Sequence, residues 1–412
     1  MTDSFSNFGL PAKLMQAIAR LQFTAPTPVQ AQAIPLVLAG KDLMATAQTG
    51  TGKTAAFGIP LISQMMDAPQ ATAIILAPTR ELASQIVDTL QQLIPLPTIK
   101  TALLIGGEAM PKQFRQLQQH PQIIVGTPGR INDHLLRGTL KLNRTRFLVL
   151  DETDRMLDMG FGAQIEKIIQ HIPAERQTLM FSATLPPNIL KLSSKYLHNP
   201  ARVAIGTANA PALQVKQEMV AIAEGEKYAA LLLQLQQRQG SIIVFVKTKH
   251  GADRLAGRLN RDRHRADAIH GNLRQRQRDK VIGNFRDEKY RILVATDVAA
   301  RGLDIPHIEH VINYDLPQAP EDYIHRIGRT GRAGASGQAV SLITAGDKAK
   351  WHAIQRLINP GEAPRGRSGE GEKTGRPQGQ HRKKHFRHSG RRHNAGGKSA
   401  RGGHPNARHS AA

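Results

Sequence analysis

The stretch that decides the fold is Ala47-Gln48-Thr49-Gly50-Thr51-Gly52-Lys53-Thr54. An apolar run over residues 42–47 leads into it and predicts a buried strand. The segment over residues 54–66 that follows has the pattern of a helix. A glycine-rich loop between a strand and the start of a helix is an arrangement that cradles phosphate groups, because the helix N-terminus presents unpaired N–H donors.

Each residue type in this loop has a physical reason to be there. Gly50 and Gly52 permit backbone conformations that bring N–H groups against a polyphosphate. Lys53 supplies a positive charge for the β and γ phosphates, and Thr54 supplies a hydroxyl for Mg²⁺. Ala47 stands where a first glycine is usual. The alternative interpretation is a glycine-rich turn between two core elements.

The length and composition limit the classes of protein to which the chain can belong. The 412 residues are enough for two domains and a tail, and 40% hydrophobic residues can fill their cores. A net charge of +24 indicates a polyanionic partner, nucleic acid before membrane, although a surface of solvated lysines has the same charge. The absence of cysteine excludes disulfides and cysteine-based sites and fits a cytoplasmic location. Residues 1–10 lack a signal-peptide pattern, and no apolar window has the length of a membrane span.

Two series of strands and helices follow one another along the chain. In residues 42–205, short apolar runs alternate with amphipathic segments, which predicts an α/β domain with a parallel sheet. A second series without a phosphate loop occupies residues 215–360, after a weakly patterned linker at 206–214. The expected strands are 73–76, 102–105, 123–125, 147–150 and 178–181 in the first series, and 242–246, 266–269, 292–295, 311–314 and 339–343 in the second.

Residues 361–412 differ in character from everything before them. They consist largely of Gly, Arg, His and Ser, and 13 Lys and Arg against 3 Glu give them +10 of the total charge. A segment this polar cannot offset its ordering entropy by burial, so we expect a disordered tail. Its expected role is a nonspecific phosphate-binding arm, and the alternative is a solubilising tail.

Polar residues that can carry chemistry follow the apolar runs. Asp151 and Glu152 end the run at 147–150, where Asp151 can hold Mg²⁺ through water and Glu152 can polarise an attacking water. The alternative is a capped strand end. The hydroxyls of Ser182-Ala183-Thr184 follow another run and can couple Asp154 to a moving element, although such pairs are usually turns or caps.

Two further segments hold candidate contacts. Gln30, at the start of a predicted helix over 29–38, has an amide that matches N6 and N7 of adenine, but alone it reads as a polar residue at a helix start. Arg326, Arg329 and Arg332 recur at helical spacing and predict one strongly basic helix face. Facing a γ-phosphate, Arg329 and Arg332 would act as arginine fingers, and a surface or RNA-facing helix is the alternative.

The motifs and their order resemble those of DEAD-box ATP-dependent RNA helicases, nearest the small bacterial RhlE-like kind, over residues 3–358. The resemblance implies two tandem RecA-like parallel-sheet domains of the α/β class and a disordered basic C-terminal tail. The implied segments are a Q-motif region at 3–31, an ATP-binding domain at 34–205, a linker at 206–214, a helicase C-terminal domain at 215–360 and the tail at 361–412.

The same resemblance assigns roles to individual residues. The implied nucleotide contacts are Phe5, Phe23, Gln30, the eight residues from Ala47 to Thr54, Gly302 and Asp304. The implied catalytic residues are Lys53, Asp151, Glu152, Arg329 and Arg332, with Thr54 and Asp151 as metal ligands. The implied coupling residues are Asp154, Ser182, Thr184 and His325. The implied RNA contacts are Pro78, Thr79, Arg80, Gly106, Gly107, Thr127, Pro128, Gly129, Arg130, Gln275, Arg278, Thr296 and Arg301.

The implied activity is hydrolysis of ATP to ADP and phosphate, with Mg²⁺, coupled to local unwinding of RNA duplexes or remodelling of RNA–protein complexes. The implied partner is structured or double-stranded RNA, read with little sequence preference, in ribosome assembly or RNA turnover in the cytoplasm. One departure from the family pattern is Thr153, where Ala is usual, and another is Gln22, where Gly is common. The alternatives from other classes are an ATP-independent RNA chaperone and a DNA translocase.

Overall fold

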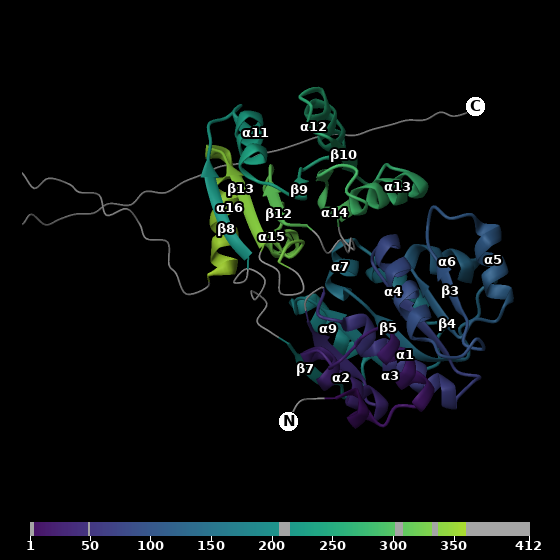
Figure 1. The fold of residues 1–412 in the computed structure, drawn as a ribbon. Helices are drawn as coiled ribbons and strands as arrows, with labels where there is room; N and C mark the ends of the chain where they lie inside the picture. Colours follow the sequence, from purple (N-terminus) through teal and green to yellow (C-terminus); the bar gives the residue numbers. More distant parts are fainter. Residues whose placement is uncertain (1–3, 48–49, 206–214, 301–307, 332–336, 360–412) are drawn as a thin grey trace, which may run out of the picture. The chain divides into compact units, whose positions relative to one another are not determined.

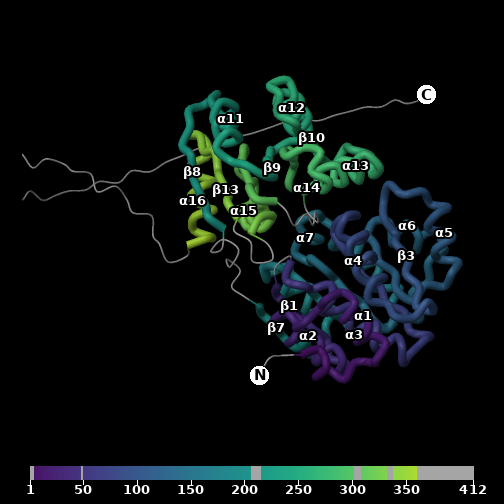
Figure 2. Tube along the Cα trace, viewed as in Figure 1, coloured from purple at the N-terminus to yellow at the C-terminus, as the bar shows by residue number. Residues whose placement is uncertain are grey.

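The computed structural model describes residues 4–47, 50–205, 215–300, 308–331 and 337–359. These residues form two parallel sheets flanked by helices, which confirms the expected α/β class with two sheet domains (Figure 1). The linker expected at 206–214 and the tail expected at 361–412 lie outside the described residues. Figure 2 follows the chain through the first domain in purple and blue and through the second from teal to yellow.

The first sheet has the order β3-β4-β2-β5-β6-β1-β7, with all neighbours parallel. Its strands are β1 (Leu43–Thr46), β2 (Thr72–Leu76), β3 (Thr101–Leu104), β4 (Ile123–Gly126), β5 (Thr145–Leu150), β6 (Gln177–Ser182) and β7 (Ala201–Ala204). The helical elements of this part are η1 (Phe5–Phe8), α1 (Ala12–Arg20), α2 (Pro28–Leu38), α3 (Lys53–Asp67), α4 (Arg80–Leu93), α5 (Met110–Gln118), α6 (Pro128–Leu136), α7 (Thr153–Asp158), α8 (Gly162–Ile169) and α9 (Pro187–Tyr196).

The second sheet has the order β10-β11-β9-β12-β13-β8 and is also parallel. Its strands are β8 (Val215–Ala221), β9 (Ile242–Phe245), β10 (Ala266–Ile269), β11 (Ile292–Ala295), β12 (His310–Asn313) and β13 (Gly337–Ile343). Its helical elements are α11 (Lys227–Gln237), α12 (Lys249–Arg261), α13 (Gln275–Arg286), α14 (Asp297–Ala300), α15 (Pro320–Ile327), η2 (Ala345–Asp347) and α16 (Lys348–Ile358).

Both faces of each sheet are buried, which explains why the strands read as continuous apolar runs. In β2, Ala73 and Ile75 belong to one core of the first domain, whereas Ile74 and Leu76 belong to the core on the opposite face. The second domain has the same two-sided construction, with separate cores on the two faces of β9. Helices flank both sheets (Figure 1), and their apolar residues belong to the same cores.

The topology brings three strand ends together in the first domain. β6 lies between β5 and β1, with Leu150 opposite Met180 and Ser182 opposite Thr46. Parallel strands end at the same edge of a sheet, so the segments that follow β1, β5 and β6 are neighbours there. Ligands of open α/β sheets bind at this carboxyl edge.

Candidate functional site

The phosphate loop joins β1 to α3, as the sequence predicts. Gly50 and Gly52 have φ angles of +83° and +89°, in the left-handed region that glycine tolerates. A Cβ atom at Gly52 would collide with the side-chain nitrogen of Gln30, so a larger residue would have to displace Gln30 as well as adopt a positive φ. Lys53 opens α3, is buried, and donates from Nζ to the Ala47 carbonyl at 3.1 Å. The helix therefore begins at the loop with its lysine already directed at the loop backbone.

The segment before α2 contacts the same loop. The Thr27 hydroxyl donates to the Thr51 carbonyl at 2.8 Å, and the Gln30 amide nitrogen donates to the Gly52 carbonyl at 3.1 Å. The Gln30 side-chain oxygen accepts from the Thr27 N–H at 3.0 Å and completes the cap of α2. Gln30 is thus a helix-capping residue that also contacts the phosphate loop, and its contact with adenine stays a prediction.

Two aromatic side chains lie near this segment. Phe5 is 3% exposed and stacks on Phe23, with ring centroids 6.4 Å apart and ring planes 24° apart. Phe23 is partly exposed and packs against the first core. Phe23 therefore retains a surface on which a base can stack, whereas Phe5 lies inside the core behind it.

Asp151 and Glu152 follow β5 and are 2% and 4% exposed. Burial raises the pKa of Asp151 to about 6, although the nearby charge of Lys53 opposes the rise. Burial also raises the pKa of Glu152, but the positive charges of Arg155, Lys53 and Arg329 outweigh it and hold that pKa below its ordinary value. The two neighbouring carboxyls therefore differ in proton affinity because only Glu152 has a close ion-pair partner.

Sequence reasoning missed that partner, Arg155. Its Nη1 donates to the Glu152 carboxylate at 2.6 Å, and the two side chains are 1% and 5% exposed. Nε and Nη2 of Arg155 are buried and have no hydrogen-bond partner among the described residues. The sequence spacing could have indicated this pair. Glu152 is the N-cap of α7, and Arg155, three positions later, lies on the same side of the helix.

Three of the four residues proposed for coupling, Asp154, Ser182 and Thr184, lie together at the end of β6, whereas His325 lies in α15. Oδ2 of Asp154 accepts hydrogen bonds from the Ala183 N–H at 3.0 Å and from the N–H and hydroxyl of Thr184 at 2.9 and 3.0 Å. The Ser182 hydroxyl does not reach Asp154 and instead donates to the Thr184 carbonyl at 2.6 Å. The Asp154 carboxylate thus stabilises the turn after β6 from outside it, and the Ser182 hydroxyl stabilises the same turn by a hydrogen bond within it.

The expected basic helix face over residues 326–332 is wrong. α15 ends at Ile327, with Gly328 as its C-cap, so Arg329 lies beyond the helix. Arg326 is 2% exposed and donates to both carboxylate oxygens of Asp297, at 2.5 and 2.8 Å, which makes it an internal structural residue. Arg329 is 3% exposed and donates to the backbone carbonyl of His325 at 3.1 Å.

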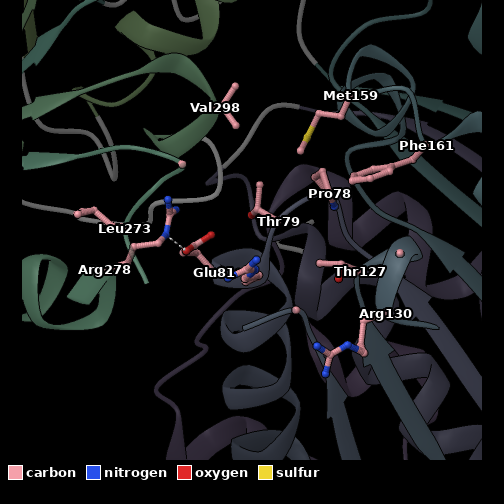
Figure 3. A pocket seen from close by; sticks show the side chains of 14 residues that line it. Pro78, Thr79, Glu81, Thr127, Arg130, Met159, Phe161, Leu273, Arg278 and Val298 are labelled. Carbon is pink, nitrogen blue, oxygen red and sulfur yellow. Dashed lines mark hydrogen bonds and ion pairs between the residues drawn. The ribbon is translucent and has the colours of Figure 1, made fainter. Parts of the chain in front are cut away.

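Eight of the residues proposed to contact RNA line one pocket of about 410 Å³ (Figure 3). They are Pro78, Thr79, Arg80, Gly106, Thr127, Gly129, Arg130 and Arg278. Burial lowers the pKa of Arg80, the carboxylate of Glu81 opposes this, and the charges of Arg278 and Arg130 lower it further. The pocket lining holds Arg80, Arg130 and Arg278 against one acid, Glu81, so it remains positive. A pocket with this electrostatics suits a phosphate backbone.

An ion pair crosses this pocket between residues far apart in sequence. Arg278 Nε donates to the Glu81 carboxylate at 2.6 Å, and both side chains are almost fully buried, as the dashed line in Figure 3 marks. Arg80 donates to the Gln275 side chain at 3.3 Å, beside it. Sequence reasoning named Arg278, Gln275 and Arg80 but missed Glu81, because nothing local to Glu81 identifies its partner.

Several proposed residues lie elsewhere or outside the described part. Gly107 packs beside the pocket, where a Cβ would lie 2.3 Å from Arg80 Nη1, while Pro128 and Thr296 are buried nearby without lining the pocket. The proposed residues outside the described ranges are Gln48, Thr49, Arg301, Gly302, Asp304 and Arg332.

In the described ranges there is no cluster of three or more His, Cys, Asp or Glu that would suit a metal. The helices seen there are also too short or too polar to cross a membrane.

Comparison with known proteins gives consistent matches along the chain. The family model described as "DEAD/DEAH box helicase" matches residues 27–192, and the one described as "Helicase conserved C-terminal domain" matches residues 226–334. "ATP-dependent RNA helicase CshA" of Listeria monocytogenes is 47% identical over 82% of this chain and 66% of its own length. "DEAD-box ATP-dependent RNA helicase CshA" of Geobacillus kaustophilus is 45% identical over 86% of this chain and 76% of its own length.

Solved structures give the same result for the fold. S. cerevisiae Dbp5 bound to RNA and ADP BeF3 is 33% identical, with a TM-score of 0.78, over 87% of this chain and 94% of that one. Mss116p bound to ssRNA and AMP-PNP is 29% identical, with a TM-score of 0.78, over 86% of this chain and 77% of that one. The chain spans about two thirds of the length of the Listeria relative and about three quarters of the Geobacillus one.

Proposed function

Because the chain belongs to the DEAD-box family of ATP-dependent RNA helicases, we propose that it hydrolyses ATP in response to RNA and uses the cycle to separate short RNA duplexes. The observation that carries this proposal is the convergence at one sheet edge of the phosphate loop, two buried carboxylates and the segment after β6. The alternative of an ATP-independent RNA chaperone is not favoured, because such a protein has no use for Lys53, Asp151 and Glu152 in this arrangement.

We assign the nucleotide contacts to the first domain. Lys53 exchanges the Ala47 carbonyl for the β and γ phosphates, and the N–H groups of the loop and of the first turn of α3 bind the remaining phosphate oxygens. Phe23 and Gln30 bind the adenine ring by stacking and by an amide pair. Glu152 orients the attacking water and accepts its proton, which its lowered pKa permits because the carboxylate is ionised at neutral pH.

The residues available at this edge fit Mg²⁺. This ion takes oxygen ligands and is held in nucleotide sites by one or two protein groups together with the phosphates. The Asp151 carboxylate and the Thr54 hydroxyl are oxygen donors of that kind, and no larger protein cage is needed. When bound, the ion neutralises charge on the β and γ phosphates. Asp151 must be ionised for this role, which its pKa of about 6 allows at neutral pH.

The second domain completes the reaction in our proposal. Arg329 and Arg332 neutralise the charge that develops on the γ-phosphate, and Asp304 and Gly302 contact the nucleotide. Asp154 couples the nucleotide site to the segment after β6, because its three hydrogen bonds to residues 183–184 make that segment move with it. His325 contributes to the same coupling.

RNA binds through its sugar–phosphate backbone in this proposal. The positive pocket lined by Arg80, Arg130 and Arg278 supports backbone recognition, which gives little sequence preference. Contacts to 2′-hydroxyls select RNA over DNA. The basic segment at 361–412 adds nonspecific affinity for the phosphate backbone.

We also propose the finer identity of the chain. In this proposal the chain is of the RhlE-like subtype, its domains have the boundaries given above, and it acts in the cytoplasm on ribosomal precursors or in RNA turnover. Sequencing of RNA crosslinked to the chain in cells tests the pathway. Enrichment of ribosomal precursors or of decay intermediates supports it, and a uniform transcriptome profile contradicts it.

The decisive experiment for the activity measures phosphate release with no nucleic acid, with RNA and with DNA, alongside unwinding of a short RNA duplex. We expect RNA to stimulate release many-fold, DNA to stimulate it little, and unwinding to require ATP. Release that is equal with and without RNA, or absent in both, contradicts the proposal. Stimulation by DNA as strong as by RNA favours a translocase of related fold.

A further inference from the structure

Thr153 is the one residue of the Asp151–Asp154 segment that the proposed mechanism does not use. It is fully buried, and its hydroxyl lies 3.1 Å from the carbonyl oxygens of both Leu150 and Phe181. A hydroxyl has a single hydrogen, so it donates to one of these carbonyls or is shared between them. An alanine, which the resembling family usually carries here, makes neither contact.

These two carbonyls belong to neighbouring strands of the site. Leu150 is the last residue of β5, and Phe181 is the last but one of β6. Thr153 therefore connects the end of one strand to the end of the other through a single side chain. The next residue, Asp154, holds the turn immediately after β6 by its bonds to Ala183 and Thr184. Two consecutive side chains thus fix the chain from Phe181 to Thr184.

The connection also bears on Glu152, which precedes Thr153. Glu152 has φ +50° and ψ +52°, a left-handed conformation that is unfavourable for a residue other than glycine. Such a conformation persists only where the surrounding structure fixes it. On the C-terminal side, that constraint begins with Thr153, which is the first residue of α7. The backbone conformation of Glu152 therefore depends in part on how firmly Thr153 is held, while Arg155 holds its carboxylate.

We propose that Thr153 is a positioning residue: its hydroxyl ties the turn that carries Glu152 to the strand that leads into Ser182–Thr184, and so preorganises the proposed general base for turnover. The inference rests on the proposed RNA-stimulated ATPase activity. It accounts for the hydroxyl at this position, because alanine has no group to bond the Phe181 carbonyl and so would not tie the turn to β6. Preorganisation acts on the chemical step and leaves ATP binding largely unchanged.

The test compares Thr153→Ala, Thr153→Val and Thr153→Ser in the full-length chain. We expect Thr153→Ala to lower the RNA-stimulated kcat about fivefold, since a single hydrogen bond of typical strength corresponds to that factor. The KM for ATP should stay within about twofold of wild type, because binding is not the step affected. Thr153→Val keeps the branched shape without the hydroxyl and should lose at least as much, while Thr153→Ser keeps the hydroxyl and should recover most of the rate.

Hydrogen exchange provides a readout that does not depend on activity. In Thr153→Ala and Thr153→Val, the amides of Ala183 and Thr184 should exchange at least several times faster, and in Thr153→Ser they should not. Unchanged exchange together with an unchanged kcat in Thr153→Ala overturns the inference. Equal loss in Thr153→Ser and Thr153→Ala also overturns it, because the side-chain volume would then be responsible. A wild-type chain that RNA does not stimulate contradicts the proposed function instead, and the exchange comparison still decides the role of Thr153.

Discussion

Asp151 and Glu152 are adjacent and similarly buried, yet replacing each with its amide should change the stability of the first domain in opposite directions. The pKa of Asp151 rises from an ordinary 3.8 to about 6, mainly because burial disfavours its charge. That rise corresponds to a folding penalty of about 3 kcal/mol for the ionised carboxylate, at about 1.4 kcal/mol for each tenfold change in proton affinity. Asp151→Asn removes the charge and should stabilise the domain by up to about 3 kcal/mol at pH 7.5, while abolishing ATP turnover.

Glu152 behaves differently because Arg155 compensates its charge. The pKa of Glu152 is lowered, so the ion pair with Arg155 contributes stability at neutral pH. Glu152→Gln leaves the buried guanidinium with a neutral acceptor in place of a carboxylate. We expect a loss of about 1–3 kcal/mol, the usual cost when a buried charged group loses its partner.

The pH dependence follows from the same pKa shifts. Because the pKa of Asp151 is raised, the folded protein binds this proton more tightly than the unfolded chain, and the penalty develops as the pH rises from about 4 to about 6. The advantage of Asp151→Asn over wild type should therefore be small near pH 4.5 and largest above pH 6. For Glu152 the sign is reversed, since its stabilising contribution is lost as the pH falls through its lowered pKa.

The assay is urea unfolding at pH 4.5 and 7.5 with a chelator present, followed by circular dichroism. Trp351 is the only tryptophan and packs against Tyr323 in the second domain, so its fluorescence is an internal control that neither substitution should move. Glu175→Gln serves as a matched control, because the Glu175 side chain is 92% exposed and should change stability little. An Asp151→Asn variant that is no more stable than wild type at pH 7.5 would refute the reasoning.

Three further predictions concern function. Lys53→Ala should abolish RNA-stimulated phosphate release, because the loop loses the positive charge that binds the phosphates. Circular dichroism should show that the variant keeps its fold. Release above about a tenth of the wild-type rate would contradict the role of Lys53. Arg329→Ala should lower kcat far more than it weakens ATP binding, measured with a fluorescent nucleotide, and equal losses in both would count against a finger role. Removing residues 361–412 should weaken RNA binding and reduce the slope of log Kd against log salt by about 3 or more, since up to +10 of charge is lost; an unchanged slope would refute the arm.

The buried strands were predictable from the sequence, whereas two strands at sheet edges were not. β2 and β9 are continuous apolar runs because both of their faces are covered. β7 and β8 lie at sheet edges and have one buried residue each, Val203 and Val215, so neither has the continuous apolar run that predicts a strand. Their place in the sheets is decided by pairing with β1 and β13, which no local pattern records.

The linear part of the site was predictable, and its tertiary pairings were not. A phosphate loop or a pair of acids after a strand is written in consecutive residues. Glu81 and Arg278 are 197 positions apart, and their ion pair depends on how the chain folds. The arginine spacing over 326–332 gave a wrong prediction for a related reason. Spacing alone predicts a helix face, but α15 ends before Gly328. Arg326 is buried because it pairs with the Asp297 carboxylate, which no local pattern indicates.

The groups proposed to act on ATP already have partners inside the protein, and this limits how each can act. Lys53 would exchange the Ala47 carbonyl for a phosphate oxygen, and a charged acceptor forms a hydrogen bond about twice as strong as a neutral one. That exchange favours binding. Glu152 differs because Arg155 already holds one of its two carboxylate oxygens, Oε2. The other oxygen can accept from the attacking water while Oε2 keeps its bond to Arg155. The same ion pair lowers the pKa of Glu152 and so makes it a weaker base. We therefore expect Arg155 to help catalysis by fixing the carboxylate in place, not by raising its basicity.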